Sequence, residues 1–339
     1  MRKTIRYIII SIISVVLTLL VVGIISINIF SNQKAEELAI DPDVTYTAEE
    51  AEELIEDAKQ EGRISVLNDI RLSLEKGDTV ISILKSLYPE YIVVAANSKY
   101  NFVPIESSLA KNNYEIDNLT EDTENGRLFY QEDGQVVSHF GIDVSSHQGD
   151  IDWAKVKEDG VEFAIIRAVY RGYGTGKLVV DEYCTKNIEG AKAAGIKVGV
   201  YVFSQAINQD EVKEEAATVE NLISGYDIDL PVVFDVEKVN DSQGRANKLS
   251  VDERTDLTIA FLEDMESKGY DTMIYHNTEM GAMLLDLNRL TDYKKWFAGY
   301  NKEFYWPYQF DLWQYSETGQ VSGVNSNVDL DIWLGDFPY

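Results

Sequence analysis

From Phe140 onward the sequence alternates between short apolar runs and longer amphipathic segments, and this alternation restricts the possible folds more than any other feature. Eight runs are rich in Val, Ile and aromatic residues: Gly141–Val144, Phe163–Val169, Val198–Phe203, Pro231–Val236, Thr272–Tyr275, Trp296–Ala298, Leu312–Tyr315 and Val328–Ile332. Three segments between them have helical periodicity: Asp181–Ala194, Asp210–Ile223 and Val251–Lys268. Buried strands that alternate with helices predict a β/α barrel. Because the last intervals are too short for helices, we expect that barrel to be irregular.

The N-terminus has the pattern of a membrane anchor. Arg2, Lys3 and Arg6 precede Tyr7–Phe30, a run of 24 residues without a charge. At about 1.5 Å of rise per residue, a helix of this length crosses the core of a bilayer. Basic residues before the run and acidic residues after it predict a cytoplasmic N-terminus and an extracellular remainder. We therefore expect residues 1–34 to form a cytoplasmic tip and a transmembrane signal anchor. The alternative is a cleaved leader, although we find no A-x-A cleavage site.

Residues 35–127 are expected to form an extracellular stalk, or a small α+β module with an acidic linker. Thr47 and Glu50 have the spacing of a capping box, and three helical patterns follow before Pro89. A short strand is expected over Tyr91–Ala96. The segment contains no motif to which chemistry can be assigned. The barrel domain is expected over residues 128–339.

Composition argues against several classes of function. Acidic residues outnumber basic ones by 58 to 30, and a net charge of −28 is poorly suited to neutralising the phosphates of a nucleic acid. Cys184 is the single cysteine, so no intramolecular disulfide is possible. His139, His147 and His276 stand far apart and have no metal-binding spacing. We therefore expect no nucleic-acid partner, no metal and no cofactor.

Acidic residues occupy three of the predicted strands, in a fold that carries its functional side chains at strand ends. These residues are Asp143 in the first strand, Asp235 and Glu237 at the end of the fourth, and Asp329 and Asp331 in the eighth. Residues two apart on a strand share a face, so each pair points the same way. Glycoside hydrolysis needs a carboxylic acid that protonates the leaving oxygen and a carboxylate that stabilises positive charge at the anomeric carbon. Crowded carboxylates favour keeping such a proton. The alternative is that these acids cap strands or form salt bridges in loops.

An ordered series of segments carries a more specific signal. The segments are Phe140-Gly-Ile-Asp-Val-Ser-Ser-His-Gln-Gly149 with Ile151-Asp-Trp153, Phe163-Ala-Ile-Ile-Arg-Ala168, Val198-Gly-Val-Tyr-Val-Phe-Ser204, Pro231-Val-Val-Phe-Asp-Val-Glu237, Trp296-Phe-Ala-Gly-Tyr300, Leu312-Trp-Gln-Tyr-Ser316 and Val328-Asp-Leu-Asp331. In this order they resemble the motifs of the glycoside hydrolase family 25 lysozymes, the Chalaropsis-type muramidases. The resemblance covers residues 140 to 337. It implies hydrolysis of the β-1,4 bond between N-acetylmuramic acid and N-acetylglucosamine in peptidoglycan.

Carried over position by position, the resemblance implies that Glu237 is the general acid. It makes Asp143, Asp235 and Asp329 the other catalytic carboxylates. It further implies that the 2-acetamido group of the substrate attacks the anomeric carbon, with Asp235 orienting or stabilising that group. A direct carboxylate nucleophile is the alternative.

Aromatic residues at or near strand ends are candidates for stacking on sugar rings, although ordinary core packing explains each of them equally well. They are Tyr201, Tyr275, Trp296, Trp313 and Tyr315. Two positions depart from the family pattern. Val202 stands where many relatives carry His, so we expect one wall of the cleft to differ. Asp331 stands where Asn is common and adds a negative charge next to Asp329.

Together these features predict a muramidase held at the cell membrane by residues 7–30, with its N-terminus in the cytoplasm and its catalytic domain outside. The glycan strands of peptidoglycan are the expected partner. Three alternatives remain: a degenerate barrel that binds glycan without cutting it, a glycosidase for a chitin-like chain, and a scaffold for other proteins. Remodelling of the cell's own wall and wall passage for a secretion or conjugation apparatus both fit a tethered enzyme.

Overall fold

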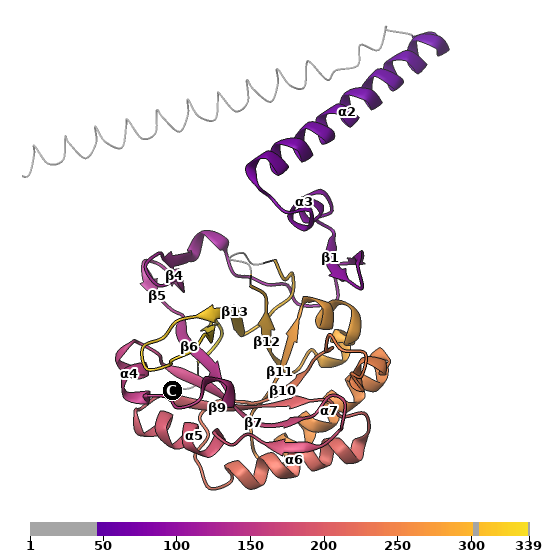
Figure 1. The fold of residues 1–339 in the computed structure, drawn as a ribbon. Helices are drawn as coiled ribbons and strands as arrows, with labels where there is room; N and C mark the ends of the chain where they lie inside the picture. Colours follow the sequence, from indigo (N-terminus) through magenta and orange to yellow (C-terminus); the bar gives the residue numbers. More distant parts are fainter. Residues whose placement is uncertain (1–45, 301–304, 338–339) are drawn as a thin grey trace, which may run out of the picture. The chain divides into compact units, whose positions relative to one another are not determined.

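The computed structural model describes residues 46–300 and 305–337. The chain divides into two compact units, Met1–Asp78 and Thr79–Tyr339, which we describe separately (Figure 1). The anchor predicted over residues 7–30 lies outside the described residues. Within the described ranges, no helix combines the length and the apolar character that crossing a membrane requires.

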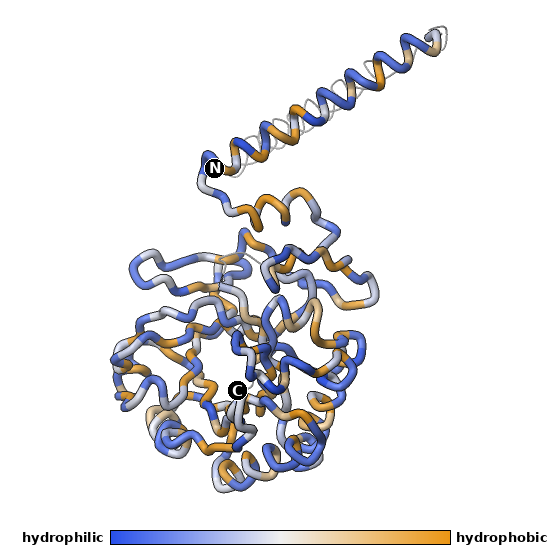
Figure 2. Tube along the Cα trace, turned by 45° about the vertical axis from the view of Figure 1, so that its right-hand side comes forward, coloured by the Kyte–Doolittle hydropathy of each residue, from blue (hydrophilic) through white to orange (hydrophobic). Residues whose placement is uncertain are grey.

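The described part of the first unit is one helix, α2 (Ala48–Lys76). It begins with the predicted capping box: the Glu50 N–H donates to Thr47 Oγ1 at 3.3 Å, and the Thr47 N–H donates to the Glu50 carboxylate at 2.8 Å. It ends at Gly77, whose φ of 95° is in the left-handed region. Hydrophobic residues recur along the helix (Figure 2), but none of its residues is buried. The helical spacing of apolar residues therefore predicted the helix correctly, but the apolar face of α2 packs into no hydrophobic core among the described residues.

The second unit begins with a helix and a hairpin. Helix α3 (Val80–Leu87) is followed by strand β1 (Tyr91–Ala96), which pairs antiparallel with β2 (Lys99–Pro104). The two turn residues, Asn97 and Ser98, have φ values of 53° and 60°, as a tight two-residue hairpin requires. The strand expected over Tyr91–Ala96 is confirmed.

A three-stranded antiparallel sheet follows, formed by β3 (Leu119–Asp122), β4 (Arg127–Glu132) and β5 (Gln135–Val136), after a single 3₁₀ turn over Ile116–Asn118. Strand β3 lies within residues 111–127, the polar and acidic segment that was expected to be the linker. Its side chains are exposed or only half-buried, so no apolar alternation marks it in the sequence. The strand forms because its backbone pairs with β4.

Eight strands close a barrel (Figure 1): β6 (His139–Val144), β7 (Phe163–Arg171), β9 (Lys197–Ser204), β10 (Val232–Val236), β11 (Thr272–Asn277), β12 (Lys294–Ala298), β13 (Leu312–Gly319) and β14 (Val328–Trp333). From β6 to β13 successive barrel strands pair in parallel, whereas β14 is antiparallel to both β13 and β6. Only residues 320–327 connect β13 to β14, too few for the crossover that a parallel pair needs. A short strand, β8 (Leu178–Val180), pairs antiparallel with β7. The predicted irregular β/α barrel is confirmed, with all eight strands.

Helices cover the outside of the barrel: α4 (Trp153–Glu158), α5 (Cys184–Ala193), α6 (Gln209–Ile223) and α7 (Val251–Ser267), with short turns at Ser146–Gln148, Ala246–Lys248, Met280–Leu284 and Leu287–Leu290. Successive strand residues point alternately outward and inward. Phe234 of β10 packs outward against Phe261 of α7, with ring centroids 4.6 Å apart. Val233 packs inside the barrel instead. The same alternation directs Asp235 inward.

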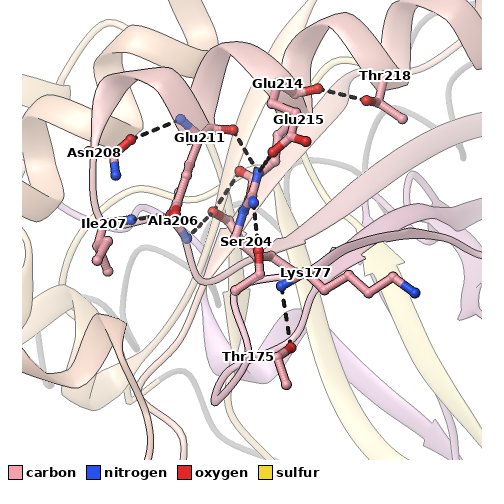
Figure 3. A network of polar contacts seen from close by, with 12 residues as sticks. Thr175, Lys177, Ser204, Ala206, Ile207, Asn208, Glu211, Glu214, Glu215 and Thr218 are labelled. Atoms are coloured by element: carbon pink, nitrogen blue, oxygen red, sulfur yellow. Dashed lines mark hydrogen bonds and ion pairs between the residues drawn. The ribbon is translucent and has the colours of Figure 1, made fainter.

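A buried ion pair ties β7 and β9 to α6 near the ends of those strands. Arg171 Nε donates to Glu215 at 2.6 Å. The Ser204 hydroxyl donates to the other oxygen of the Glu215 carboxylate at 2.7 Å (Figure 3). Arg171 also donates to the Glu214 carboxylate at 2.9 Å and to the Glu211 carbonyl at 2.8 Å. Desolvation raises the pKa of Glu215 to about 7, against the effects of Arg171 and Ser204. The network therefore links the C-terminal ends of β7 and β9 to α6 at the rim of the barrel.

Candidate active site

A cavity of about 240 Å³ lies at the rim where the parallel strands end. All eight barrel strands, or the residues directly after them, contribute to its lining, which comprises Asp143, Arg167, Tyr201, Phe203, Asp235, Glu237, Tyr275, Trp296, Tyr300, Gln314, Glu317 and Asp329. The structure therefore brings the four predicted catalytic carboxyl groups together in one cavity.

Asp143 and Asp329 meet across a strand pair. Asp143 is near the C-terminal end of β6, Asp329 is near the N-terminal end of β14, and the two are register partners. Because β14 runs against the other strands, its beginning lies where they end. Desolvation, and then the charge of Glu317, raise the pKa of Asp329 to about 6. The reversal of one strand thus completes the acidic cluster.

Asp235 and Glu237 form a second acidic pair. Desolvation raises the pKa of Glu237 to about 7, and a hydrogen bond from Asn277 Nδ2 to its Oε1, at 3.3 Å, opposes this shift. Burial and the charge of Glu237 raise the pKa of Asp235 well above its ordinary value, and Arg167 opposes that shift. At neutral pH the pair therefore retains a proton, as neighbouring buried carboxyls do.

Gln314 connects Asp143 to two tyrosines. Its Nε2 donates to Asp143 Oδ2 at 2.7 Å, and its Oε1 accepts from the hydroxyls of Tyr275 and Tyr300, each at 3.0 Å. Burial, followed by the charges of neighbouring acids, raises the pKa of Asp143 well above its ordinary value. The amide of Gln314 therefore orients Asp143 and both hydroxyls as one unit.

Asp331 does not line the cavity. It pairs in register with Gly141, one inward-facing position deeper than Asp329, and is fully buried. Its Oδ1 accepts from Trp296 Nε1 at 2.9 Å. Burial, and then the charge of Asp329, raise its pKa well above the ordinary value. The additional acid is therefore a neighbour, inside the barrel, of the carboxyl groups predicted to be catalytic.

Arg167 places a positive charge at the cavity, and sequence reasoning assigned it no role. Its Nε donates to Asp181 Oδ2 at 2.8 Å, and a terminal nitrogen donates to Ser146 Oγ at 3.0 Å. The Ser146 N–H also donates to Asp181 Oδ2 at 3.0 Å. The signal was present in the sequence as an arginine inside the apolar run Phe163–Val169.

Three of the five predicted aromatic residues line the cavity, and two do not. Tyr201, Tyr275 and Trp296 line it. Trp313 and Tyr315 point outward because Gln314, between them, points inward. Trp313 Nε1 donates to the Gly299 carbonyl at 2.8 Å, and the Tyr315 hydroxyl accepts from the Leu128 N–H at 3.4 Å. Both belong to the core outside the barrel.

The alternation along β9 also corrects the expectation for Val202. Tyr201 lines the cavity, whereas Val202 is fully buried in the outer core, so the prediction that it alters a wall of the cleft was wrong. Tyr300, the last residue of the motif Trp296-Phe-Ala-Gly-Tyr300 and not among the predicted site residues, is 49% exposed and places its ring at the mouth of the cavity. Phe203 and Glu317 also line it and carried no separate signal in the sequence.

Comparison with known proteins agrees with this geometry. The profile of glycosyl hydrolases family 25 matches residues 142–324, more than half of the chain. An autolytic lysozyme of Clostridium acetobutylicum is 32% identical over 192 residues, which cover 56% of this chain and 54% of that protein. Lysozyme M1 of Streptomyces globisporus is 28% identical over 218 residues, covering 58% of this chain and 67% of that protein. The chain thus spans about half the length of the first of these relatives.

Two solved structures share the fold. The modular autolysin LytC from Streptococcus pneumoniae superposes with a TM-score of 0.50 at 22% identity, covering 64% of this chain and 52% of that chain. A family 25 glycosyl hydrolase from Bacillus anthracis gives a TM-score of 0.50 at 24% identity, covering 64% of this chain and 96% of that chain. The family resemblance seen in the motifs is confirmed: the chain belongs to glycosyl hydrolases family 25.

Proposed function

We propose that this protein is a peptidoglycan muramidase that hydrolyses the β-1,4 bond between N-acetylmuramic acid and N-acetylglucosamine. The observation that carries the proposal is the convergence of four carboxyl groups on one cavity: Asp143, Asp235, Glu237 and Asp329. Membership in a glycosyl hydrolase family and two relatives named lysozymes support a glycan strand of peptidoglycan as the substrate.

Glu237 is the proposed general acid. With its pKa raised to about 7, it is mostly protonated below neutral pH and is a strong enough acid to assist departure of a sugar oxygen. As the bond between the anomeric carbon and the glycosidic oxygen breaks, that oxygen takes the proton of Glu237.

Asp235 is the proposed partner of the substrate's 2-acetamido group. In the described part of the chain its buried Oδ1 has no hydrogen-bond partner, and the N–H of that group would supply one. The acetamido oxygen attacks the anomeric carbon while the leaving sugar takes the proton. Water then opens the cyclic intermediate and returns a proton to Glu237. Inhibition by a thiazoline analogue of this intermediate supports the route, whereas a covalent glycosyl–protein adduct in mass spectrometry would establish the carboxylate-nucleophile alternative.

Asp143 and Asp329 are proposed to stabilise the positive charge that develops on the sugar. Both line the same cavity as Asp235 and Glu237 but come from other strands, β6 and β14. The hydrogen bond from Gln314 holds Asp143 in place. The ionised form of either carboxyl, held in a partly dry site, stabilises an oxocarbenium-like transition state more strongly than it would in water.

The test is mass spectrometry of the fragments that the full chain releases from purified peptidoglycan. Reducing ends on N-acetylmuramic acid would support the proposed bond, and reducing ends on N-acetylglucosamine would refute it. Glu237→Gln should lower the rate by roughly 10² to 10⁴, the usual contribution of a general acid. Equal binding and no cleavage by both proteins would instead indicate a glycan-binding barrel.

We also propose a location at the cell membrane, with the N-terminus cytoplasmic and the catalytic domain outside, where its own cell's wall is within reach. The proposal rests on the uncharged run over residues 7–30 and its basic flank. Cell fractionation with protease treatment of intact cells tests it. Recovery of the protein in the medium lacking residues 1–30 would refute the anchor.

A further inference from the structure

A second cavity, of about 360 Å³, adjoins the first. The two share Glu237, Tyr275 and Tyr300 in their linings, so they are continuous on the side of the proposed general acid. Its volume is within the range of ligand pockets, about 300–1,000 Å³. The cavity therefore extends the catalytic cavity by a space of ligand size.

One wall of this second cavity comes from a segment that precedes the family-matched residues 142–324. Ile81 and Lys85 contribute from α3, and Val93, Val94 and Ala95 contribute from β1. Ala95 is exposed, whereas its neighbours on the strand are buried. This part of the chain, to which the sequence assigned no chemistry, thus reaches the edge of the catalytic cavity.

Polar contacts fix the wall to the barrel. The Val93 N–H donates to the Tyr305 hydroxyl at 2.5 Å, and the Lys85 ammonium lies 3.2 Å from the centroid of the Tyr305 ring. At the hairpin turn, Lys238 Nζ donates to Asn97 Oδ1 at 3.0 Å and pairs with Glu279 at 2.6 Å. A wall held at both ends presents a preformed surface to a ligand, which limits the entropy lost on binding.

We propose that the second cavity binds the sugar on the leaving side of the scissile bond, with α3 and β1 forming its outer wall. The inference rests on the proposed function. A general acid protonates the oxygen between two sugars, so it must lie between their two binding sites. Asp143, Asp235 and Asp329 line the cavity on one side of Glu237 only. The sugar whose anomeric carbon reacts belongs there, and the second cavity remains for the sugar that departs.

The lining chemistry suits an N-acetylhexosamine. Ile81 and Ala95, which are partly or fully exposed, supply apolar surface for a pyranose face or an acetamido methyl group. Tyr300 lies in both linings and is half exposed, where a ring can stack on a sugar. The carboxylate of Glu279, which also lines the cavity, is already paired with Lys238. Its charge is therefore balanced within the protein, as suits an uncharged ligand.

The test places a bulky side chain in the cavity by substituting an exposed residue of its outer wall. Ala95→Trp in the full chain should lower kcat/KM on glycan strands by roughly tenfold or more, the scale of one lost binding contact. A β-glycosyl fluoride of N-acetylmuramic acid carries a single atom in place of the leaving sugar, so its hydrolysis should be unchanged. Lys99→Trp, an exposed position on β2 outside the lining, is the matched control and should match the wild type on both substrates.

The outcomes separate the two proposals. Unchanged glycan cleavage by both Ala95→Trp and Ile81→Trp, or an equal loss on glycan and fluoride, would overturn the leaving-side site. The proposed function would stand as long as the wild type cleaves glycan and Glu237→Gln does not. If the wild type cleaves neither substrate, the proposed function itself fails.

Discussion

The hydrogen bond from Asn277 to Glu237 offers a quantitative test of the proposed acid. It joins Asn277 Nδ2 to Glu237 Oε1 at 3.3 Å and stabilises the ionised carboxylate, so it lowers the pKa of Glu237. A bond to a charged group contributes about 1.5–3 kcal/mol at good geometry, and we take about 1 kcal/mol for this long one. Removing it in Asn277→Ala should raise the pKa of Glu237 by roughly 0.7, since 1.36 kcal/mol corresponds to one unit.

The assay is the pH dependence of kcat/KM on soluble glycan strands. Because the general acid must be protonated, activity falls as pH rises through the pKa of Glu237, about 7. The basic limb of Asn277→Ala should therefore move to higher pH. In the wild type, Asn277 Oδ1 accepts a hydrogen bond from the Met280 N–H at 3.0 Å, and Asn277→Asp keeps this acceptor. The same variant places a negative charge beside Glu237. It should move the limb further in the same direction. A basic limb that stays in place or moves to lower pH in both variants would refute Glu237 as the acid.

Three other perturbations follow from the structure. Arg171→Leu leaves Glu215 buried without its cation, so the free energy of unfolding in urea at pH 8 should fall by about 3–5 kcal/mol. The loss should be smaller at pH 5, where Glu215, with its pKa raised to about 7, is neutral; an equal loss at both pH values would contradict this account. Asp331→Asn removes a buried carboxyl group that, whenever it is ionised, raises the pKa of Asp143, so the acidic limb of the activity profile should move to lower pH. A limb that moves upward would argue against an ionised Asp143 in catalysis. Tyr300→Ala should raise KM for glycan several-fold with little change in melting temperature, because the ring is half exposed; an unchanged KM would remove it from the binding site.

Much of the candidate site was predictable because a strand has a strict period of two. An inward Val233 requires an inward Asp235, and Glu237 follows on the same side. The same rule, applied to β13, would have excluded Trp313 and Tyr315 once the direction of Gln314 was known. The sequence supplies the alternation, but it does not state which of two alternating sets faces the interior when both contain aromatic residues.

The sequence by itself determined the eight buried strands, their order, the family and the four acids, since each depends on local periodicity or on residues adjacent in the chain. Only the tertiary structure decided that β14 runs antiparallel and brings Asp329 to Asp143. It likewise decided that Ala95 lies at a cavity shared with Glu237. These contacts join positions more than a hundred residues apart. They depend on how the closed barrel and the preceding hairpin pack, and no local pattern encodes that packing.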